Sequence, residues 1–178
     1  MADVGFVGVD TYDYTVMDDD GETSTATVTV TVTDPPIVTS TYRNRGRPKL
    51  LTDEGTFTST IEITDAVAIQ DINVQLDIRH RRVSDLDVFL VSAAGTRIEL
   101  FTDVGRFGDH FKNTVLDDDA ATSIEYGTAP YEATFRPEGD LSMLEGENLN
   151  GTWTLEITDD RAGRLGRLRR WTLIVDHF

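Results

Sequence analysis

The side chains best suited to chemistry are carboxylates in the stretch from Ser84 to Asp119. Asp85 and Asp87 lie two residues apart in an alternating apolar pattern, so in a strand both carboxylates point to the same face. Two like charges side by side are unfavourable unless something neutralises them. Calcium, which takes about six to eight oxygen ligands, would do so. The alternative is a solvated acidic rim.

More oxygen donors follow in the loops of the same region and after the Trp153 segment. Carboxylates would be the main ligands, with backbone carbonyls and an asparagine amide completing the shell. The sequence therefore predicts a calcium-binding module, and the candidate ligands are Asp85, Asp87, Asp103, Asp109, Asn113, Asp117, Asp118, Asp159 and Asp160.

Motifs typical of enzymes are missing from the sequence. There is no G-x-S-x-G segment, and His80, His110 and His177 do not have the spacing of a metal-binding motif. Ser84, His80 and Asp85 can be combined on paper into a triad, but no sequence context supports it. We therefore expect no catalytic residues, no bound organic cofactor and a non-catalytic role.

Composition limits the partners. The chain has 178 residues and a formal net charge of -16, which argues against nucleic acid and anionic membrane surfaces. Cysteine is absent, which excludes disulfides. The first ten residues lack the basic and apolar regions of a signal peptide, so an exported protein would carry its signal upstream.

The charge distribution predicts a boundary between two units. Residues 1–42 contain no Lys or Arg, and Pro35-Pro36 follows the first strand patterns. We therefore predict a first unit over residues 1–36 and a second over residues 37–178.

Two alternating segments, Val9–Val16 and Thr23–Thr33, predict a β-hairpin around an acidic turn that ends at Gly21. They resemble the last two strands of bacterial cadherin-like or Ig-like repeats. A lone hairpin is marginal in water, so the resemblance implies a remnant of an upstream repeat. Its unprotected edges also allow pairing with another copy of the chain.

The second unit has period-two alternation with Gly-, Asn- and Asp-rich turns, which predicts an all-β antiparallel sandwich of about eight strands. Residues 34–56 are expected to connect the units, and Asp140–Leu144 to form a short helical turn. Strands are predicted near residues 57–63, 67–80, 86–90, 98–100, 152–159 and 168–175. Trp153 and Trp171 are expected in the core, and the expected exposed aromatic contacts are Phe89, Phe107, Tyr126 and Tyr131.

Basic residues gather in two places. The run from Arg43 to Lys49 is either a basic patch or a solvated linker. The segment after Asp159 carries further arginines, which would suit an acidic partner such as the acidic hairpin of this chain or another copy. They are Arg161, Arg164, Arg167, Arg169 and Arg170.

Four ordered segments carry a family resemblance. They read SDLDVFLVSAAGTRIELFTDVG, NTVLDDDA, FRPEGDLSMLEGENLNGTWTLEITDD and GRLRRWTLIV. Over about residues 40–178 the chain resembles the P domain that follows the catalytic domain in subtilisin-like proprotein convertases and recurs in secreted bacterial proteases.

The resemblance implies a jelly-roll sandwich and an accessory role. The domain would stabilise or modulate the catalytic domain of a serine endopeptidase, in a secreted or cell-surface bacterial protein. Its partners would be the upstream domains of the same polypeptide. The alternative is an adhesion module that recognises protein or polysaccharide.

Overall fold

A computed structural model describes residues 6–178, so residues 1–5 of the predicted first unit lie outside the described residues. The chain divides into two compact units, one ending at Pro36 and the other running from Ile37 to Phe178. None of the helices in the described part is long and apolar enough to cross a membrane.

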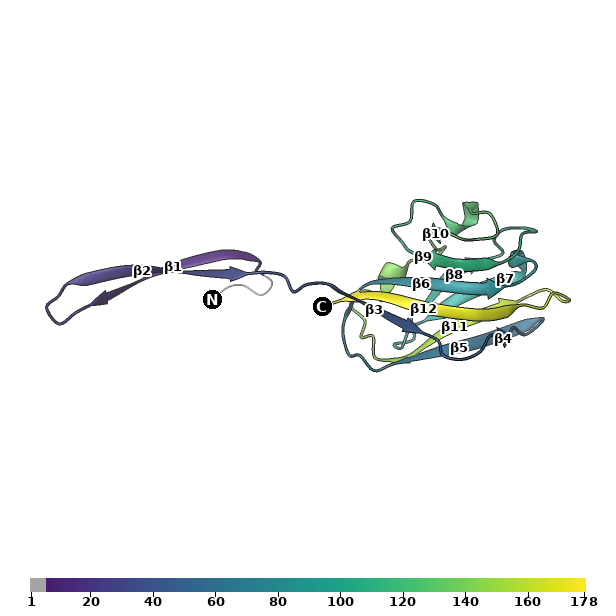
Figure 1. Cartoon of the computed structure of the whole chain (residues 1–178), viewed down its shortest axis with the longest axis horizontal. Coiled ribbons are helices and arrows are strands. Elements are labelled where there is room, and N and C mark those ends of the chain that lie inside the picture. The colour runs from purple at the N-terminus through teal and green to yellow at the C-terminus, as the bar shows by residue number, and fades with distance from the viewer. Residues whose placement is uncertain (1–5) are drawn as a thin grey trace. The chain divides into compact units, whose positions relative to one another are not determined.

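The first unit is the predicted hairpin. Strands β1 (Gly8–Met17) and β2 (Thr23–Val32) are antiparallel and form a two-stranded sheet (Figure 1). Asp18 closes the turn, because its Oδ1 accepts the Glu22 N–H at 2.8 Å.

The two faces of this hairpin differ. Tyr12 lies opposite Val28 and Tyr14 opposite Ala26, so apolar side chains share one face, while threonines dominate the other. Tyr12 is 57% exposed and Tyr14 is 50% exposed. Little apolar surface is therefore buried in this unit, and hydrogen bonding between two strands has to hold it together.

We expect the backbone amides of β1 and β2 to exchange with solvent orders of magnitude faster than those of the central strands of the second unit, because a two-stranded sheet opens easily. Hydrogen–deuterium exchange followed by mass spectrometry measures this. Equal protection would contradict the expectation. Protection that rises with protein concentration would instead indicate self-association through the hairpin.

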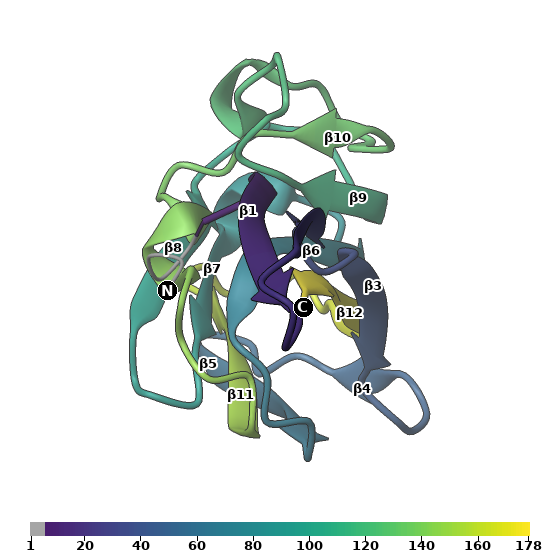
Figure 2. The same cartoon turned by 90° about the vertical axis from the view of Figure 1, so that its left-hand side faces the viewer.

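The second unit is a sandwich of two sheets, which appear as separate layers in the end-on view (Figure 2). The six-stranded sheet has the order β10-β9-β6-β12-β3, with β4 also paired to β12, and the four-stranded sheet has the order β5-β11-β7-β8. The strands are β3 (Val38–Arg43), β4 (Lys49–Leu50), β5 (Gly55–Ile63), β6 (Ile69–Arg79), β7 (Leu86–Val91), β8 (Arg97–Thr102), β9 (Phe111–Leu116), β10 (Thr134–Phe135), β11 (Gly151–Asp159) and β12 (Arg167–His177). Three short 3₁₀ helices are η1 (Val83–Asp85), η2 (Ile124–Tyr126) and η3 (Leu141–Leu144).

The alternating residues of the strands form the core between the sheets. On β6, for example, Val74, Leu76 and Ile78 are fully buried. Trp171 on β12 reaches across to the other sheet, where its Nε1 donates to Ser59 Oγ at 3.0 Å. Trp153 is equally buried and donates to the Leu149 carbonyl at 2.8 Å. The predicted sandwich and the predicted core positions of both tryptophans are confirmed.

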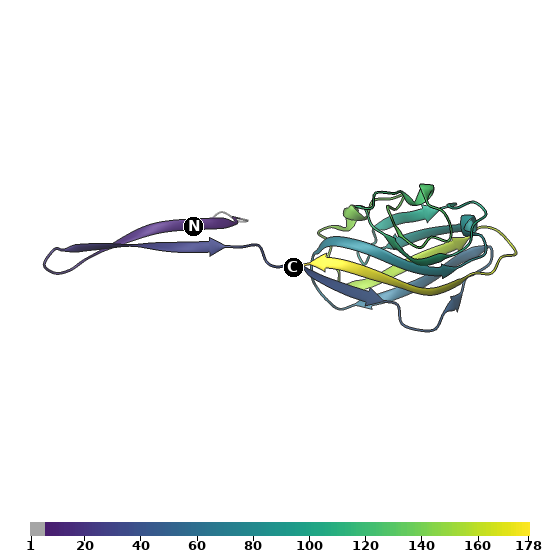
Figure 3. The ribbon, with the colours of Figure 1, turned by 45° about the horizontal axis from the view of Figure 1, so that its top comes forward.

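The prediction that residues 34–56 only connect the units was wrong for β3 and β4. Strand β3 pairs along β12, from Val38 opposite His177 to Arg43 opposite Thr172, and Figure 3 shows β12, in yellow, between β3 and β6. The segment VTSTYR contains few strongly apolar residues. Its partner is the last strand of the chain, so no local sequence signal marked it.

The aromatic side chains follow the predictions only in part. Phe107 is 82% exposed and Tyr126 is 81% exposed, as expected. Tyr131 is fully buried, with its ring 4.9 Å from that of Phe111 and 5.4 Å from that of Phe135. Its prediction as an exposed contact was wrong, because the stretch before β10 folds inward over the end of the core.

Candidate functional site

A buried polar cluster ties together the loops at one end of the sandwich. His80 follows β6 and is 1% exposed. Its Nδ1 lies 2.6 Å from the Arg82 carbonyl, and its Nε2 lies 2.8 Å from the Arg164 carbonyl and 3.1 Å from Asp159 Oδ2. The Arg82 N–H also lies 3.2 Å from Nδ1, so both ring nitrogens are engaged in hydrogen bonds within the domain.

Asp159 ends β11 and is 1% exposed. Burial raises the pKa of this carboxyl group, while hydrogen bonds from the Arg161 N–H and from His80 act in the opposite direction. The contact between His80 and Asp159 joins the loops after β6 and β11. Because both ring nitrogens of His80 are engaged in hydrogen bonds, neither is free to act as a base towards solvent.

Asp85 at the end of η1 is neutralised by arginine. Its buried carboxylate lies 3.2 Å from Arg82 Nε and 3.5 Å from Arg164 Nη1. The Asp85 carbonyl accepts the Asp160 N–H at 3.0 Å. Ser84 Oγ accepts from Arg82 Nε at 3.3 Å. Asp85 therefore meets two cationic side chains of its own domain, and Ser84 is bonded to an arginine rather than to His80.

A more open acidic group lies beside this cluster, on and after β7 and β8. Burial raises the pKa of Asp87, and the negative charges of Asp103, Asp160 and Glu99 raise it further. The Asp103 N–H donates to the Asp87 carboxylate and partly offsets this. Asp103 itself lies in the turn after β8 and has a φ of 51°, in the left-handed region. Mutual repulsion among these carboxylates is what a bound cation would relieve.

We expect Asp87→Asn to stabilise the protein in EDTA at pH 7 by about 1 kcal/mol or less. The folded-state pKa of Asp87 is raised, so the folded state holds its proton more readily than the unfolded state, and stability falls as pH rises from about 3.9 through the raised value. The gain should therefore shrink towards pH 3. Urea unfolding at several pH values measures it, with the exposed Glu145→Gln as the control for lost charge. A loss of stability that is equal at every pH would contradict the prediction.

A second acidic group lies at the opposite end of the sandwich. Strand β9 runs antiparallel to β6, with Leu116 opposite Val74, so Asp117 and the residues after it lie at the Asp71 end of β6. Burial raises the pKa of Asp71, followed by the charges of Asp117 and Asp176. The nine residue steps from Asp71 to His80 span about 30 Å of strand, so no single ion reaches both groups.

Two buried oxygens of this second group lack a hydrogen-bond partner within residues 6–178. They are Asn73 Oδ1, whose amide nitrogen donates to Asp71 at 3.0 Å, and Asp118 Oδ1. The other oxygen of Asp118 accepts the Ser142 N–H at 2.8 Å. Burial raises the pKa of Asp118, and its contact with the carboxyl of Asp140 adds to this.

The remaining predicted ligands are engaged elsewhere or exposed. Asp109 lies 3.7 Å from His110 at the surface, and Asn113 Oδ1 accepts from Arg170 Nη2 at 2.6 Å. The His80 end thus holds Asp85, Asp87, Asp103, Asp109, Asp159 and Asp160, whereas Asp117 and Asp118 lie at the Asp71 end. In the part of the chain that the structure describes, no three His, Asp or Glu side chains are close enough to hold a metal ion.

Sequence reasoning did not select Asp71 or Asp140, which complete the second acidic group. Asp71 belongs to the outward-facing series of β6 with Asn73, and this spacing was the available signal. Asp140 caps η3 by accepting from Ser142 N at 3.1 Å.

Comparison with known proteins identifies the family of this chain. The family model "Proprotein convertase P-domain" matches residues 69–175, which span β6 through most of β12 and contain both acidic groups. The chain belongs to this family. The resemblance to the P domain predicted from the sequence is therefore confirmed, and the match lies within the compact unit of residues 37–178.

Two solved structures share the fold of this P-domain chain. One is the serine protease of Aeromonas sobria in complex with a chaperone, with a TM-score of 0.54 and 18% identity over 98% of this chain. The other is the serine protease of Aeromonas sobria alone, with a TM-score of 0.53 and 18% identity over 99% of this chain. This chain spans only 37% and 38% of their lengths. No curated protein matches the sequence.

Proposed function

We propose that this P domain is a non-catalytic accessory domain of a larger exported protein, in which it stabilises or modulates a subtilisin-like serine protease domain. The observation that carries the proposal is the family match over residues 69–175. The similarity in fold to two Aeromonas sobria serine proteases supports it. The enclosed His80–Asp159 pair agrees with a structural role for the polar residues in the domain.

The test uses the chain alone and fused behind a subtilisin-like catalytic domain that lacks its own P domain. Alone, the chain should neither hydrolyse casein nor react with a fluorophosphonate probe for active serines. In the fusion, the catalytic domain should keep its activity longer at elevated temperature than without the chain. Hydrolysis by the chain alone, or no gain in the fusion, would overturn the proposal.

The proposal includes a more specific property of the accessory domain, which is that it binds calcium. It is supported by the burial and the neighbouring negative charges that raise the pKa values of Asp71 and Asp87, and by the buried oxygens of Asn73 and Asp118 that lack a partner. Hard oxygen donors of this kind fit calcium. Carbonyl oxygens and water would have to complete either shell, because three carboxylates do not converge among the described residues. The Asp71 end is the better fit, because its two unsatisfied oxygens would gain a partner.

We expect excess calcium to raise the melting temperature relative to EDTA by roughly 5–10 °C, because an ion at about 100 times its dissociation constant adds about 2.7 kcal/mol. Differential scanning calorimetry measures the shift. Asp118→Asn should abolish most of it, whereas Glu145→Gln should retain it. An unchanged melting temperature, together with no calcium in elemental analysis, would show that the acidic groups are solvated rims.

A further inference from the structure

A basic surface lies on this otherwise acidic protein. Strand pairing brings together three segments that are far apart in the sequence: Arg167 lies opposite Arg79, Lys49 opposite Leu168, and Arg43 opposite Thr172. Half of the 16 basic residues of the chain belong to it. We define the basic surface as Arg43, Arg45, Arg47, Lys49, Arg79, Arg167, Arg169 and Arg170.

Few carboxylates neutralise the basic surface. Arg169 lies 3.6 Å from Asp77, and Arg170 donates to the uncharged Asn113 amide at 2.6 Å. Arg79 and Arg167 are exposed and directly opposite on neighbouring strands, a placement that is unfavourable for like charges. Within residues 6–178, no ion pair involves six members of the surface: Arg43, Arg45, Arg47, Lys49, Arg79 and Arg167.

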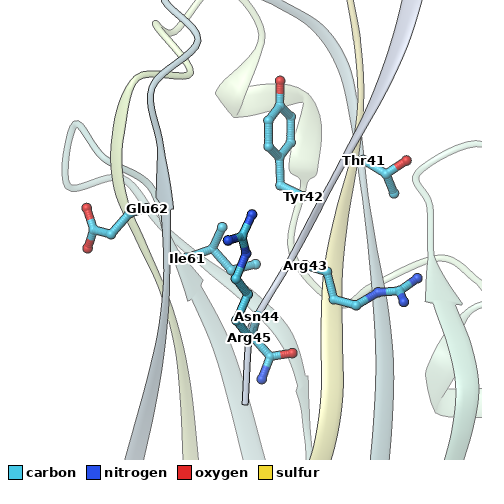
Figure 4. Close-up of a pocket in the computed structure, with 7 residues that line it drawn as sticks. All are labelled: Thr41, Tyr42, Arg43, Asn44, Arg45, Ile61 and Glu62. Carbon is cyan, nitrogen blue, oxygen red and sulfur yellow. The ribbon is translucent and has the colours of Figure 1, made fainter.

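The surface continues into an opening between the two sheets. Strands β3 and β5 are edge strands, and between them lies an opening of about 390 Å³ lined by residues 41–45 with Ile61 and Glu62. Figure 4 shows Arg45 reaching towards Ile61, while Arg43 and Glu62 point away to opposite sides.

The β5 edge is open to another strand. β5 is nine residues long, pairs with β11 in one continuous register and contains no proline, lysine or bulge that would block its free edge. Proteins normally protect such edges. An extended peptide laid along β5 would hydrogen bond to its backbone and pass beside the guanidinium group of Arg45.

We propose that the basic surface and the adjoining β3–β5 opening bind an extended acidic segment of another polypeptide. Guanidinium groups pair with carboxylates through two parallel hydrogen bonds, and the free edge of β5 offers backbone hydrogen bonds that only a polypeptide matches. The proposal concerns a partner surface and is independent of the proposed association with a protease.

Other ligands fit this surface less well. Sugar rings and nucleic acid bases stack on exposed aromatic rings, but the one aromatic lining the opening, Tyr42, is half-buried and donates its hydroxyl to Asp65 at 2.6 Å. A second copy of the chain offers no matching strand in residues 6–36, because the strands there carry only Asp10 and Asp13 and the other acidic residues lie outside them.

The binding test uses the full chain and two synthetic decapeptides, one alternating Asp and Thr and one alternating Asn and Thr. Fluorescence anisotropy should show saturable binding of the Asp peptide and at least about tenfold weaker binding of the Asn peptide. Raising the ionic strength from about 0.05 to 0.3 M should weaken binding of the Asp peptide, because exposed charges are screened.

Variants assign the binding to this surface. Arg79→Gln with Arg167→Gln, and Arg43→Gln with Arg45→Gln, should each weaken binding of the Asp peptide by about tenfold. Arg106→Gln with Arg136→Gln removes the same charge from exposed positions outside the surface and should leave binding unchanged. The Arg79 and Arg167 pair should melt no lower than the original protein, because the substitution removes a like-charge contact.

Four outcomes would overturn the proposal. Equal binding of both peptides, or equal losses in the control variant, would show that the charge on this surface does not select the ligand. Tighter binding of pectate, a uronate polysaccharide, than of the Asp peptide would assign the surface to a glycan. A dimer in sedimentation analysis that dissociates in the Arg79 and Arg167 variant would assign it to a second copy of the chain.

Discussion

Trp171→Ala should destabilise the sandwich by about 3–5 kcal/mol. The indole is fully buried on a central strand of the six-stranded sheet and donates to Ser59 on the edge strand of the other sheet. Truncation leaves a cavity between the layers and removes the bond that joins them. Since small domains are stable by about 5–15 kcal/mol, the variant should lose a large part of its stability. Urea unfolding followed by the fluorescence of Trp153 measures this.

One further variant separates the effect of the cavity from that of the hydrogen bond, and another serves as a surface control. Ser59→Ala leaves the Trp171 Nε1–H without its partner and should cost about 1–3 kcal/mol. Tyr126→Ala removes an aromatic ring that is 81% exposed and should change stability by about 0.5 kcal/mol or less. If Trp171→Ala cost no more than Tyr126→Ala, the indole would not be the link between the sheets.

His80→Ala should destabilise the domain by about 3–5 kcal/mol and lower the melting temperature by roughly 6–20 °C. The substitution leaves Asp159 buried without its hydrogen-bond partner and removes the contacts of the ring to the carbonyls of Arg82 and Arg164. The loops after β6 and β11 then lose the side chain that joins them. Calorimetry of the full chain measures the change.

A double variant tests whether the cost comes from leaving Asp159 buried without its partner. His80→Ala combined with Asp159→Ala removes both partners, so it should be less destabilised than the sum of the two single variants. Additive losses would show that His80 acts through packing alone. A melting temperature within about 2 °C of the original for His80→Ala would contradict the structural role of the pair.

Much of the fold was predictable because apolar and polar residues alternate along its strands. From Ile72 to Ile78 on β6 and from Trp153 to Ile157 on β11 every second residue is apolar, and these apolar residues are buried. Such a period of two residues can be recognised within a short segment of the sequence. The run of aspartates that ends at Gly21 likewise predicted the hairpin turn, in which Asp18 accepts the Glu22 N–H.

The elements that were missed depend on distant partners. Strand β3 has a weak pattern and is stabilised by β12, with Thr39 Oγ1 donating to Asp176 at 2.5 Å across 137 positions of sequence. The sequence placed Tyr131 in a loop, yet its ring is buried because it packs against the rings of Phe111 and Phe135. Strand β3 therefore depends on its pairing with the distant strand β12, and Tyr131 on a ring of β9 that precedes it in the chain.

The sequence by itself determined the all-β class, the core tryptophans and the family, because apolar alternation and ordered motifs are properties of short segments. Only the tertiary structure decided which carboxylates meet. Asp85 and Asp117 look like parts of one acidic stretch, but the antiparallel register of β6 and β9 sends them to opposite ends of the sandwich. The pairing of β6 with β12 places Arg79 opposite Arg167, and the packing of the two sheets brings His80 to Asp159. These pairings follow from the burial of the whole core, which no short segment encodes.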